Sequence, residues 1–325
     1  MAFGRSILAC AALLLLAPVA VDAQDKPLRV ALVLPGPITD GTFNSAANKG
    51  IELAKKKYKL DVSMQENTPF AGMEEALLNY ARAGYDVVIG HGFQFAEPAK
   101  KIHKRFAKTW FVVTMAKVSG GPNLASLDVR LGDSGYVAGA LAALVSKTGV
   151  IGTVGGITVP VIQEYTDGFE RGAKRFRPDI EVLSAYVGSF TDVAKAKEIT
   201  TSMIERRADV VTAQGNESVM GTINAAKEAK IMAIGTFFDA HMAAPESIVS
   251  TALVNMDVGI DLLLGKIIDG SIEPRNYLFG FKEGVLGLAP YHGFDAKIPA
   301  ADKEKIRALI ADIEAGKVKD LPKIR

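Results

Sequence analysis

Residues 149–176, GVIGTVGGITVPVIQEYTDGFERGAKRF, show the alternation of strand and helix on which the fold depends. The apolar run Gly149–Val154 predicts a short strand, and Gly155-Gly156 ends it. Val161–Phe176 then has the spacing of a helix. A buried strand followed directly by a helix is typical of a parallel sheet that is covered by helices.

The same alternation continues on both sides of this stretch. Short apolar runs predict further strands at Leu28–Leu34, Leu60–Met64, Asp86–Gly90, Trp110–Met115, Val182–Val187, Val210–Ala213 and Met232–Gly235. Helical spacing is found at Phe43–Tyr58, Met73–Ala81, Pro98–Phe106, Gly135–Val145, Asp192–Arg206, Val219–Ala229 and, with many charges, Lys303–Glu314. Two successive β-α-β-α-β runs predict an α/β protein with two parallel sheets, each covered by helices on both faces.

Length and composition agree with this class. The chain has 325 residues, which suits two domains of about 150 residues each. Its hydrophobic fraction of 49% and charged fraction of 23% exclude disordered, collagen-like and coiled-coil proteins. The formal net charge of +2 gives no indication of a nucleic-acid partner. A single cysteine excludes a disulfide framework or a cysteine-based metal site within one chain.

The first 23 residues have the pattern of a secretory signal peptide. Arg5 precedes an apolar run, residues 7–20, that ends at the small-residue site Val21-Asp22-Ala23. This run is short for a membrane span, which needs about 20 residues. We therefore expect cleavage near Ala23 and export of a chain that begins at Gln24. An uncleaved anchor and lipidation at Cys10 are the alternatives.

Common catalytic motifs are absent from the sequence. It has no phosphate-binding G-x-x-x-x-G-K-[ST] loop, and Gly90-His91-Gly92 lacks the third glycine of a dinucleotide-binding loop. Ser134 does not lie in a G-x-S-x-G elbow. The four histidines are scattered, without carboxylates at metal-ligand spacing, and His103 is expected at the surface of a Lys/Arg-rich helix. An exported α/β protein of this kind is expected to bind a ligand, without a cofactor or metal, rather than to catalyse a reaction.

Four loops follow predicted strands, where ligands bind in open parallel sheets. In the first, Phe43 is suited to stacking on a planar ligand, whereas Thr42 and Asn44 are equally suited to capping the next helix. In the second, two glycines let the backbone approach a ligand closely. The candidate ligand-binding residues on the four loops are Asp40, Thr42, Phe43, Asn44, Gly92, Phe93, Gln214, Asn216, Phe237 and Asp239.

The third and fourth loops offer polar groups. Gln214 and Asn216 carry donors and acceptors that suit the edge of a heterocycle, although an Asx-type turn explains them equally well. Two consecutive phenylalanines end the strand before the fourth loop, so one is expected to point inward and the other toward the cleft. Asp239 is suited either to accepting an N–H from a ligand or to capping a helix.

Seven segments occur in the order found in a known family. They are Thr42-Phe43-Asn44, Gly90-His91-Gly92-Phe93, residues 136–142, residues 152–156 with Pro160, residues 167–173, residues 188–192, and Asn255-Met256-Asp257. Together they resemble the basic membrane protein family of ABC-transporter substrate-binding proteins, whose best-known members bind purine nucleosides. The resemblance implies a type I periplasmic-binding-protein fold, in which two Rossmann-like lobes joined by three hinge crossings close on a ligand. Phe43 matches the aromatic stacker of the family.

The resemblance also implies a domain organisation and partners. Lobe I would comprise residues 24–128 and about 249–279, and lobe II residues 129–248 and about 280–325. The expected ligand is a purine-like small molecule, and the expected partner is an ABC permease in the inner membrane. The protein would be a periplasmic monomer with no nucleic-acid partner.

Two positions depart from the pattern of the family. Many members carry G-x-D-x-D in the fourth loop, where this chain has Phe237 at the first acidic position. Many also carry a lysine before the asparagine of K-N-x-D, where this chain has Val254. Apolar side chains there would leave sugar hydroxyls unpaired, at a cost of about 1–3 kcal/mol each. We therefore expect a nucleobase, or a similar flat heterocycle, to be favoured over a nucleoside.

Two other classes of function share some of these features. An exported α/β enzyme, such as a nucleoside hydrolase or a sugar-processing protein, would need paired carboxylates or a metal in the cleft. The strand-end acids Asp40, Glu217 and Asp239 do not form a cluster in the sequence. A ligand sensor for a membrane receptor would have the same fold, and the sequence leaves that alternative open.

Overall fold

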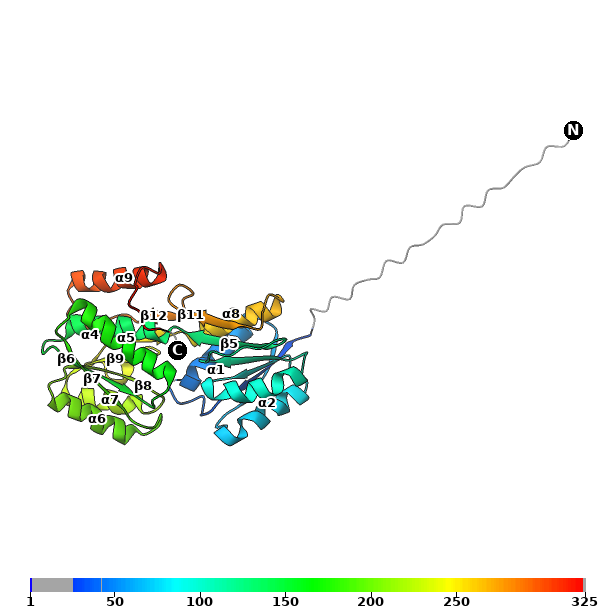
Figure 1. The fold of residues 1–325 in the computed structure, drawn as a ribbon, viewed down its shortest axis with the longest axis horizontal. Coiled ribbons are helices and arrows are strands. Elements are labelled where there is room, and N and C mark those ends of the chain that lie inside the picture. Colours follow the sequence, from blue (N-terminus) through cyan, green and yellow to red (C-terminus); the bar gives the residue numbers. More distant parts are fainter. Residues whose placement is uncertain (2–25, 42, 324–325) are drawn as a thin grey trace.

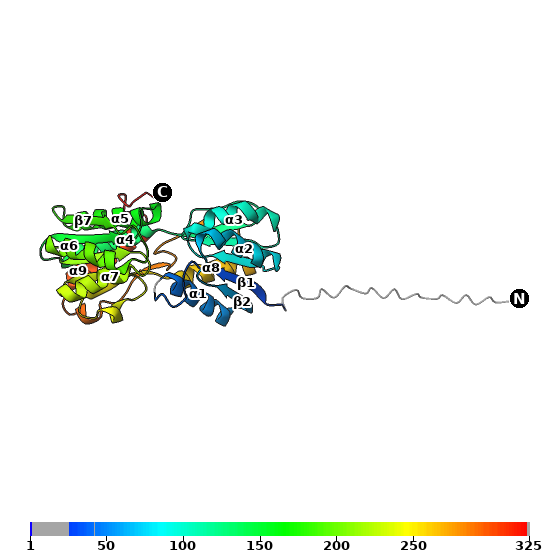
Figure 2. The ribbon, with the colours of Figure 1, turned by 90° about the horizontal axis from the view of Figure 1, so that it is seen from below.

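The computed structural model describes residues 1, 26–41 and 43–323. The expected signal peptide and Thr42 lie outside the described residues. Two α/β bodies lie side by side and are joined by several connections (Figures 1 and 2). This confirms the predicted fold class of two lobes with mostly parallel sheets.

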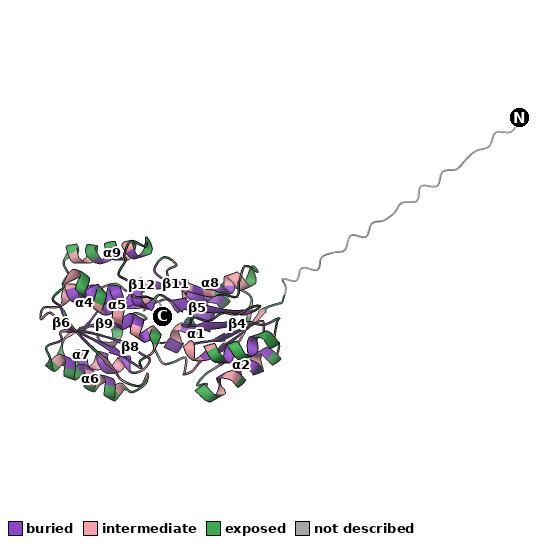
Figure 3. Cartoon of the chain, in the orientation of Figure 1, coloured by how far each residue is buried: buried purple, intermediate pink, exposed green. Residues whose placement is uncertain are grey.

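Lobe I is built on a six-stranded, all-parallel sheet in the order β11-β5-β4-β3-β1-β2. Its strands are β1 Leu28–Val33, β2 Leu60–Gln65, β3 Val87–Gly90, β4 Trp110–Thr114, β5 Leu124–Val129 and β11 Asn276–Phe279. Its helices are α1 Phe43–Lys57 and α8 Met256–Ile268, which pack together on one face, and α2 Met73–Arg82 and α3 Ala96–Ile102 on the other. The apolar runs of these strands are buried because helices cover both faces (Figure 3).

Lobe II is built on a second six-stranded sheet in the order β12-β10-β9-β8-β6-β7, in which only β12 is antiparallel. Its strands are β6 Val150–Gly155, β7 Glu181–Tyr186, β8 Val210–Gln214, β9 Met232–Phe237, β10 Ile248–Val254 and β12 Leu286–Leu288. Its helices are α4 Leu131–Val145 and α5 Pro160–Phe176 on one face, α6 Val193–Glu205 and α7 Val219–Ala229 on the other, and the outer helix α9 Ala300–Glu314.

The chain crosses between the lobes after β5, after β10 and after β11. Backbone hydrogen bonds tie the crossings together, from Arg130 N–H to the Phe279 carbonyl at 2.8 Å and from Asn255 N–H to the Val285 carbonyl at 2.7 Å. The expected start of the second lobe I segment, near residue 249, is wrong because β10 pairs with β9 in the sheet of lobe II. That crossing therefore follows Val254.

Glycines set the packing of α4 against α5. A Cβ added at Gly139 would lie 1.9 Å from the Phe169 carbonyl oxygen, and one added at Gly172 would lie 1.9 Å from that of Tyr136. The two backbones thus touch directly, which only glycine allows. This contact explains why α4 is buried almost all round, since α5 covers one side and the sheet covers the other. No helix in the described part of the chain combines the length and the apolar composition needed to cross a bilayer.

Candidate functional site

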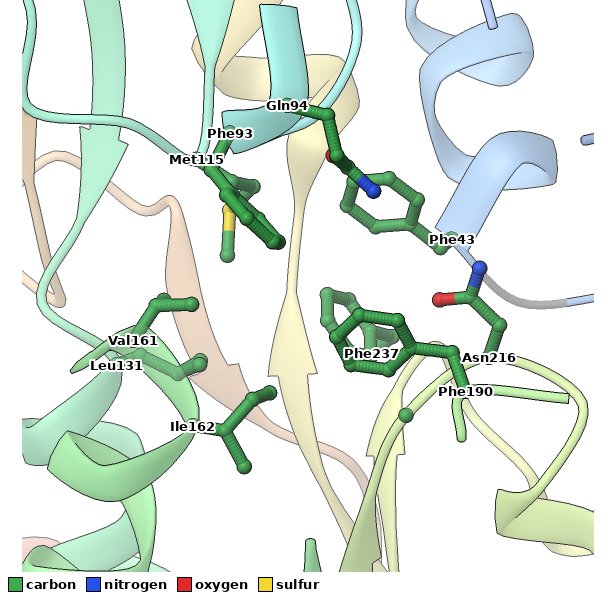
Figure 4. Close-up of a pocket in the computed structure, with 11 residues that line it drawn as sticks. Phe43, Phe93, Gln94, Met115, Leu131, Val161, Ile162, Phe190, Asn216 and Phe237 are labelled. Atoms are coloured by element: carbon green, nitrogen blue, oxygen red, sulfur yellow. The ribbon is translucent and has the colours of Figure 1, made fainter. Parts of the chain in front are cut away.

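A pocket lies between the two lobes, where the carboxyl ends of both sheets face each other. The space that it bounds is about 440 Å³ when the part open to solvent is included. Every lining residue follows or ends a strand, and the side chains point toward a common space (Figure 4). The lining residues are Phe43, Phe93, Gln94 and Met115 from lobe I, and Leu131, Val161, Ile162, Phe190, Gly215, Asn216 and Phe237 from lobe II.

The lining is aromatic, apolar and uncharged. Four phenylalanines contribute to it, and no charged side chain does so among the described residues. Gln94 and Asn216 are the polar side chains on its wall. A charged ligand would lose its hydration here without gaining a counter-charge, which is costly in a low-dielectric site. The arrangement therefore suits an uncharged, flat molecule with a few polar groups on its edge.

Phe43 lies at the start of α1, and the ring of His91 stacks on one face of its ring. The two rings stack with their centroids 3.9 Å apart and their planes at 27°. Phe237 of lobe II meets the Phe43 ring edge-on, with centroids 5.9 Å apart and planes at 77°. Aromatic pairs of this geometry stabilise a defined ring orientation by about 0.5–1.5 kcal/mol. The ring of Phe43 is thus held by contacts from both lobes.

Two pocket residues have backbone conformations that bulky side chains rarely adopt. Met115 has a φ of 53° and Phe237 a φ of 72°, and each lies at the end of a strand. A side chain in the left-handed region costs of order 1–3 kcal/mol, and such positions cluster at functional sites. The strain places both side chains in the pocket, where a relaxed strand end would turn them elsewhere.

Several polar atoms near the pocket are buried without a hydrogen-bond partner among the described residues. They include Gln94 Oε1 and both amide atoms of Gln214, whose side chain is almost fully buried at the end of β8. Burial raises the pKa of the nearby Tyr165 above its usual range, and the Thr212 hydroxyl and the Gln214 amide partly oppose this. The amide of Gln214 still makes no hydrogen bond of normal geometry. Such atoms are expected to gain partners when the site is in use.

Not all of the candidate residues line the pocket. Phe43, Phe93, Asn216 and Phe237 do so, whereas Gln214 lies just behind Gly215. Gly92 lies behind the ring of Phe43, with a φ of 115°, and its N–H donates to Thr114 Oγ1 at 3.0 Å. Its positive φ explains why glycine is needed at this position.

Asp40 and Asn44 are hydrogen-bonded to each other at the start of α1. Asp40 accepts hydrogen bonds from the backbone N–H groups of Asn44 and Ser45, at 2.8 and 3.0 Å, and from both of their side chains. These are the N–H groups that a helix cannot satisfy internally. Asp40 thus caps the helix that carries Phe43, and neither Asp40 nor Asn44 is among the residues that line this pocket. Their role as ligand contacts stays a prediction.

Asp239 is also outside the pocket, because it belongs to a histidine cluster. Its Oδ2 atom accepts a hydrogen bond from His292 Nε2 at 2.6 Å, and the rings of His241 and His292 stack with centroids 4.1 Å apart. Asp239 instead lines a second groove on the other side of Phe237, together with Lys49 and Asp257. Phe237 lines both spaces and so separates an apolar pocket from a polar groove.

Seven of the lining residues are not among the candidates taken from the sequence. Phe190 lies in one of the family-like segments, residues 188–192, which was the signal that could have identified it. Met115, Leu131, Val161 and Ile162 carry no such signal, because an apolar residue after a strand is more often part of the core. Gln94 directly follows the second predicted loop and Gly215 lies in the third, so their position next to candidate residues was the available signal. Within the described residues, no group of three or more histidine, cysteine or acidic side chains could hold a metal ion.

Comparisons with known proteins agree with this geometry. Residues 28–319 match the family described as ABC transporter substrate-binding protein PnrA-like. Basic membrane protein A of Borreliella afzelii is 27% identical over 267 residues, which cover 80% of this chain and 82% of the relative. A purine-binding protein of Brucella abortus is 25% identical over 276 residues, covering 84% and 77% respectively.

A solved structure shows the same fold. The solute-binding protein of an ABC transporter system from Aeropyrum pernix superposes with a TM-score of 0.81 at 22% identity, over 90% of this chain and 93% of that one. The family match covers nearly all of the described chain, and the fold, the cleft between lobes and the aromatic pocket are consistent with it. This chain is a member of the PnrA-like family of ABC-transporter substrate-binding proteins.

Proposed function

We propose that this protein is a periplasmic receptor that binds a purine base, or a similar flat and uncharged heterocycle, and delivers it to an ABC permease. The observation that carries the proposal is the pocket itself, which is lined by four phenylalanines and no charged side chain among the described residues. Amino acids, nucleotides and sugar acids would each bury an unpaired charge there. Export by the expected signal peptide and a monomeric state are part of the same proposal.

Aromatic side chains from both lobes support binding of a flat ring. Phe43 and Phe93 come from lobe I, and Phe190 and Phe237 come from lobe II. A planar ligand that lies between rings of opposite lobes gains stacking with each only when the lobes are closed. Ligand binding and closure would therefore be coupled, as a transport receptor requires.

The edge of the ligand would be recognised by amides. Gln94 and Asn216 line the pocket, and Gln214 lies directly behind it, with no hydrogen bond of normal geometry to its amide from any described residue. Amides can donate to ring nitrogens and accept from N–H groups, so they suit the donor and acceptor edge of a purine. The purine-binding relative from Brucella abortus is consistent with this ligand class.

Phe237 favours a base over a nucleoside. It forms the wall between the apolar pocket and the polar groove that contains Lys49, Asp239 and Asp257. A ribose attached to the base would have to pass this wall or bury its hydroxyls among apolar side chains, at a cost of about 1–3 kcal/mol for each unpaired group.

A thermal-shift screen tests the proposal. The panel comprises purine bases, their ribonucleosides and nucleotides, amino acids and neutral sugars, with the mature chain from Gln24. A ligand at 100 times its dissociation constant stabilises the folded state by about 2.7 kcal/mol, which gives a clear shift in Tm. We expect purine bases to give the largest shifts. A shift with amino acids or sugars, and none with bases, would overturn the assignment.

The matched pair Phe43→Ala and Phe238→Ala locates the site. Phe43 lines the pocket, whereas Phe238 is 40% exposed and lines only the groove outside it. Loss of the stacking ring is expected to weaken base binding by about 1–3 kcal/mol, while Phe238→Ala should leave affinity within about twofold of wild type. Equal effects of the two variants would place the ligand elsewhere.

A further inference from the structure

His91 is a buried titratable residue to which ligand binding, as proposed above, assigns no role. Its side chain has no solvent exposure and lies beneath the ring of Phe43, so it cannot touch a molecule in the pocket. Its Nε2 atom lies 3.0 Å from the carbonyl oxygen of Phe43. His91 therefore contacts Phe43 twice, by ring stacking and by a hydrogen bond to the main chain of the same residue.

The hydrogen bonds around His91 assign a donor and an acceptor at each contact, and so assign the tautomer of the ring. The N–H of Gly92 donates to Thr114 Oγ1 at 3.0 Å, and Thr114 Oγ1 lies 2.8 Å from His91 Nδ1. A carbonyl can only accept, so Nε2 carries the proton that bonds to Phe43. Nδ1 of a neutral ring is then the acceptor, and the Thr114 hydroxyl donates to it. Gly92 N–H, the Thr114 hydroxyl proton and both ring nitrogens of His91 thus each take part in one hydrogen bond.

The neutral ring fits its surroundings. Burial lowers the pKa of His91 to about 4, although the Phe43 carbonyl and the charge of Asp40 oppose this. In a cationic ring both nitrogens would donate, so the Thr114 hydroxyl would accept from Nδ1 and from Gly92 N–H and would lose Nδ1 as the acceptor of its own proton. The geometry and the burial therefore select the same neutral tautomer, with the proton on Nε2.

This chain of contacts joins three parts of the lobe I wall. Phe43 begins α1, His91 and Gly92 follow β3, and Thr114 ends β4 directly before the pocket residue Met115. A flat ligand gains full stacking only if the Phe43 ring is already in place when it binds, since ordering a free side chain on binding costs about 0.5–1.5 kcal/mol. His91 therefore connects the start of α1, which carries the Phe43 ring, to the ends of β3 and β4, and so holds the ring in a fixed position.

We infer that His91 is a positioning residue that fixes the ring of Phe43 for stacking on the ligand, with Thr114 as the group that holds His91 in its Nε2–H tautomer. The inference rests on the proposed function only in taking the ligand to be flat and to stack on Phe43. It assigns His91 no contact with the ligand and no proton transfer.

Thr114→Val with Thr109→Val as its control gives the first test. Both threonines are buried in lobe I, but the Thr109 hydroxyl donates to the Tyr85 carbonyl, away from the pocket. Loss of the Thr114 hydroxyl should weaken binding of a purine base about fivefold to tenfold, the equivalent of one hydrogen bond. Thr109→Val should lower stability without a comparable change in affinity. An equal loss of affinity in both variants would show that the Thr114–His91 hydrogen bond has no specific effect on binding and would contradict the positioning role of His91.

A double-mutant cycle tests whether His91 acts through Phe43. His91→Gln, which retains a donor but not the ring, should weaken base binding at least fivefold in the wild type, about 1 kcal/mol. In the Phe43→Ala background the same change should alter affinity by less than about twofold, because the ring that His91 positions is gone. Additive losses would contradict a positioning role.

Nitrogen NMR of the imidazole provides a readout that needs no ligand. In the ligand-free wild type, His91 should show a protonated Nε2 and an unprotonated, hydrogen-bonded Nδ1 from pH 8 down to about pH 5. Thr114→Val should shift the Nδ1 signal and the Phe43 ring signals, whereas Thr109→Val should leave both in place. A proton on Nδ1, or a cationic ring at pH 7, would overturn the inference. If no heterocycle binds, the proposed function fails, while this measurement still decides the tautomer of His91 and its effect on the Phe43 ring.

Discussion

Phe237 lines two separate spaces of the cleft between the lobes. Its φ of 72° turns the ring into the space between the lobes, where it meets Phe43 edge-on and closes the apolar pocket on one side. The polar groove lies immediately beyond it. A single side chain in a strained conformation therefore lies between the apolar pocket and the polar groove.

Polar side chains in place of Phe237 and Val254 should change the preference between a base and its ribonucleoside. Phe237→Asp and Val254→Lys together place polar groups at two positions that line the groove. We expect the preference for a base over its ribonucleoside to narrow or reverse, since sugar hydroxyls gain partners worth about 1 kcal/mol each. Titration calorimetry with both ligands measures the change. An unchanged preference would show that other residues exclude the sugar.

The sequence predicted part of the site at this scale. Phe43, Phe93, Asn216 and Phe237 were recognised because they follow strands and are aromatic or polar. Asp40 caps α1, and the sequence pattern does not separate this use of a carboxylate before a helix from a ligand contact. The position of His103 was also wrong, since it is buried and bonded through Nδ1 to Asn123 at 3.1 Å. The contact joins residues 20 positions apart, so the spacing of residues around His103 does not predict it.

At the scale of elements, the contact between α4 and α5 is the most constrained feature of lobe II. Both helices carry glycines where the other helix crosses, so their backbones meet without intervening side chains. The ends of these helices supply Leu131, Val161 and Ile162 to the pocket. Any change that separates the helices therefore also moves one wall of the site.

Gly139→Ala should be strongly destabilising. The new Cβ would lie 1.9 Å from the Phe169 carbonyl oxygen, a distance that forces the helices apart. We expect a loss of at least about 3 kcal/mol in the free energy of unfolding. Gly293→Ala is the matched control, because a Cβ there meets nothing within 4 Å. Equal stability of the two variants in denaturant titrations would contradict the close packing.

Asp133, in the first turn of α4, should make stability depend on pH. Burial raises its pKa to about 6, and Arg130 only partly opposes this. The folded state therefore binds this proton more tightly than the unfolded state, where the pKa is about 3.9. Its contribution to stability is fully present below pH 4 and is lost as the pH rises through 6.

The substitution Asp133→Asn removes this dependence. At pH 8 the variant should be more stable than wild type by about 1–3 kcal/mol, and the difference should vanish below about pH 4. Asp179→Asn, at an exposed carboxylate, is the control. Unfolding titrations from pH 4 to pH 8 measure both. A variant that is less stable than wild type at pH 8 would show that the charge is needed.

Most elements followed from the sequence, with ends within a few residues of the predicted ones. The elements that it did not predict are β5, β10, α8, β11 and β12. β5 lacks a simple apolar pattern because its polar Ser126 is buried and bonded to Asn276 from a distant strand. α8 has apolar residues on most of its surface and so shows no periodicity that distinguishes a helix from a strand.

At the scale of the whole molecule, three crossings join lobes that share one pocket. The crossings are bonded to one another through the backbone, whereas the pocket between the lobes is lined by side chains from both. Connections of this kind favour rotation of one lobe against the other. The contact between Phe43 and Phe237 links the two lobes across the cleft and corresponds to a closed arrangement.

Small-angle scattering should detect this motion. Without ligand, the lobes are expected to open, because no bound molecule then bridges the aromatic side chains of the two lobes. Addition of a saturating purine base should reduce the radius of gyration and bring the scattering curve to that of the arrangement in Figure 1. The Phe43→Ala variant at the same base concentration serves as the control. An unchanged radius in the wild type would exclude closure on binding.

The central claim is that an uncharged, flat heterocycle binds between the lobes and that Phe237 excludes a sugar. Titration calorimetry of the wild-type mature chain with adenine and with adenosine tests it most directly. We predict that adenine binds at least about tenfold more tightly, since an unpaired hydroxyl in the pocket costs about 1–3 kcal/mol. Tighter binding of adenosine, or no binding of either, would contradict the account.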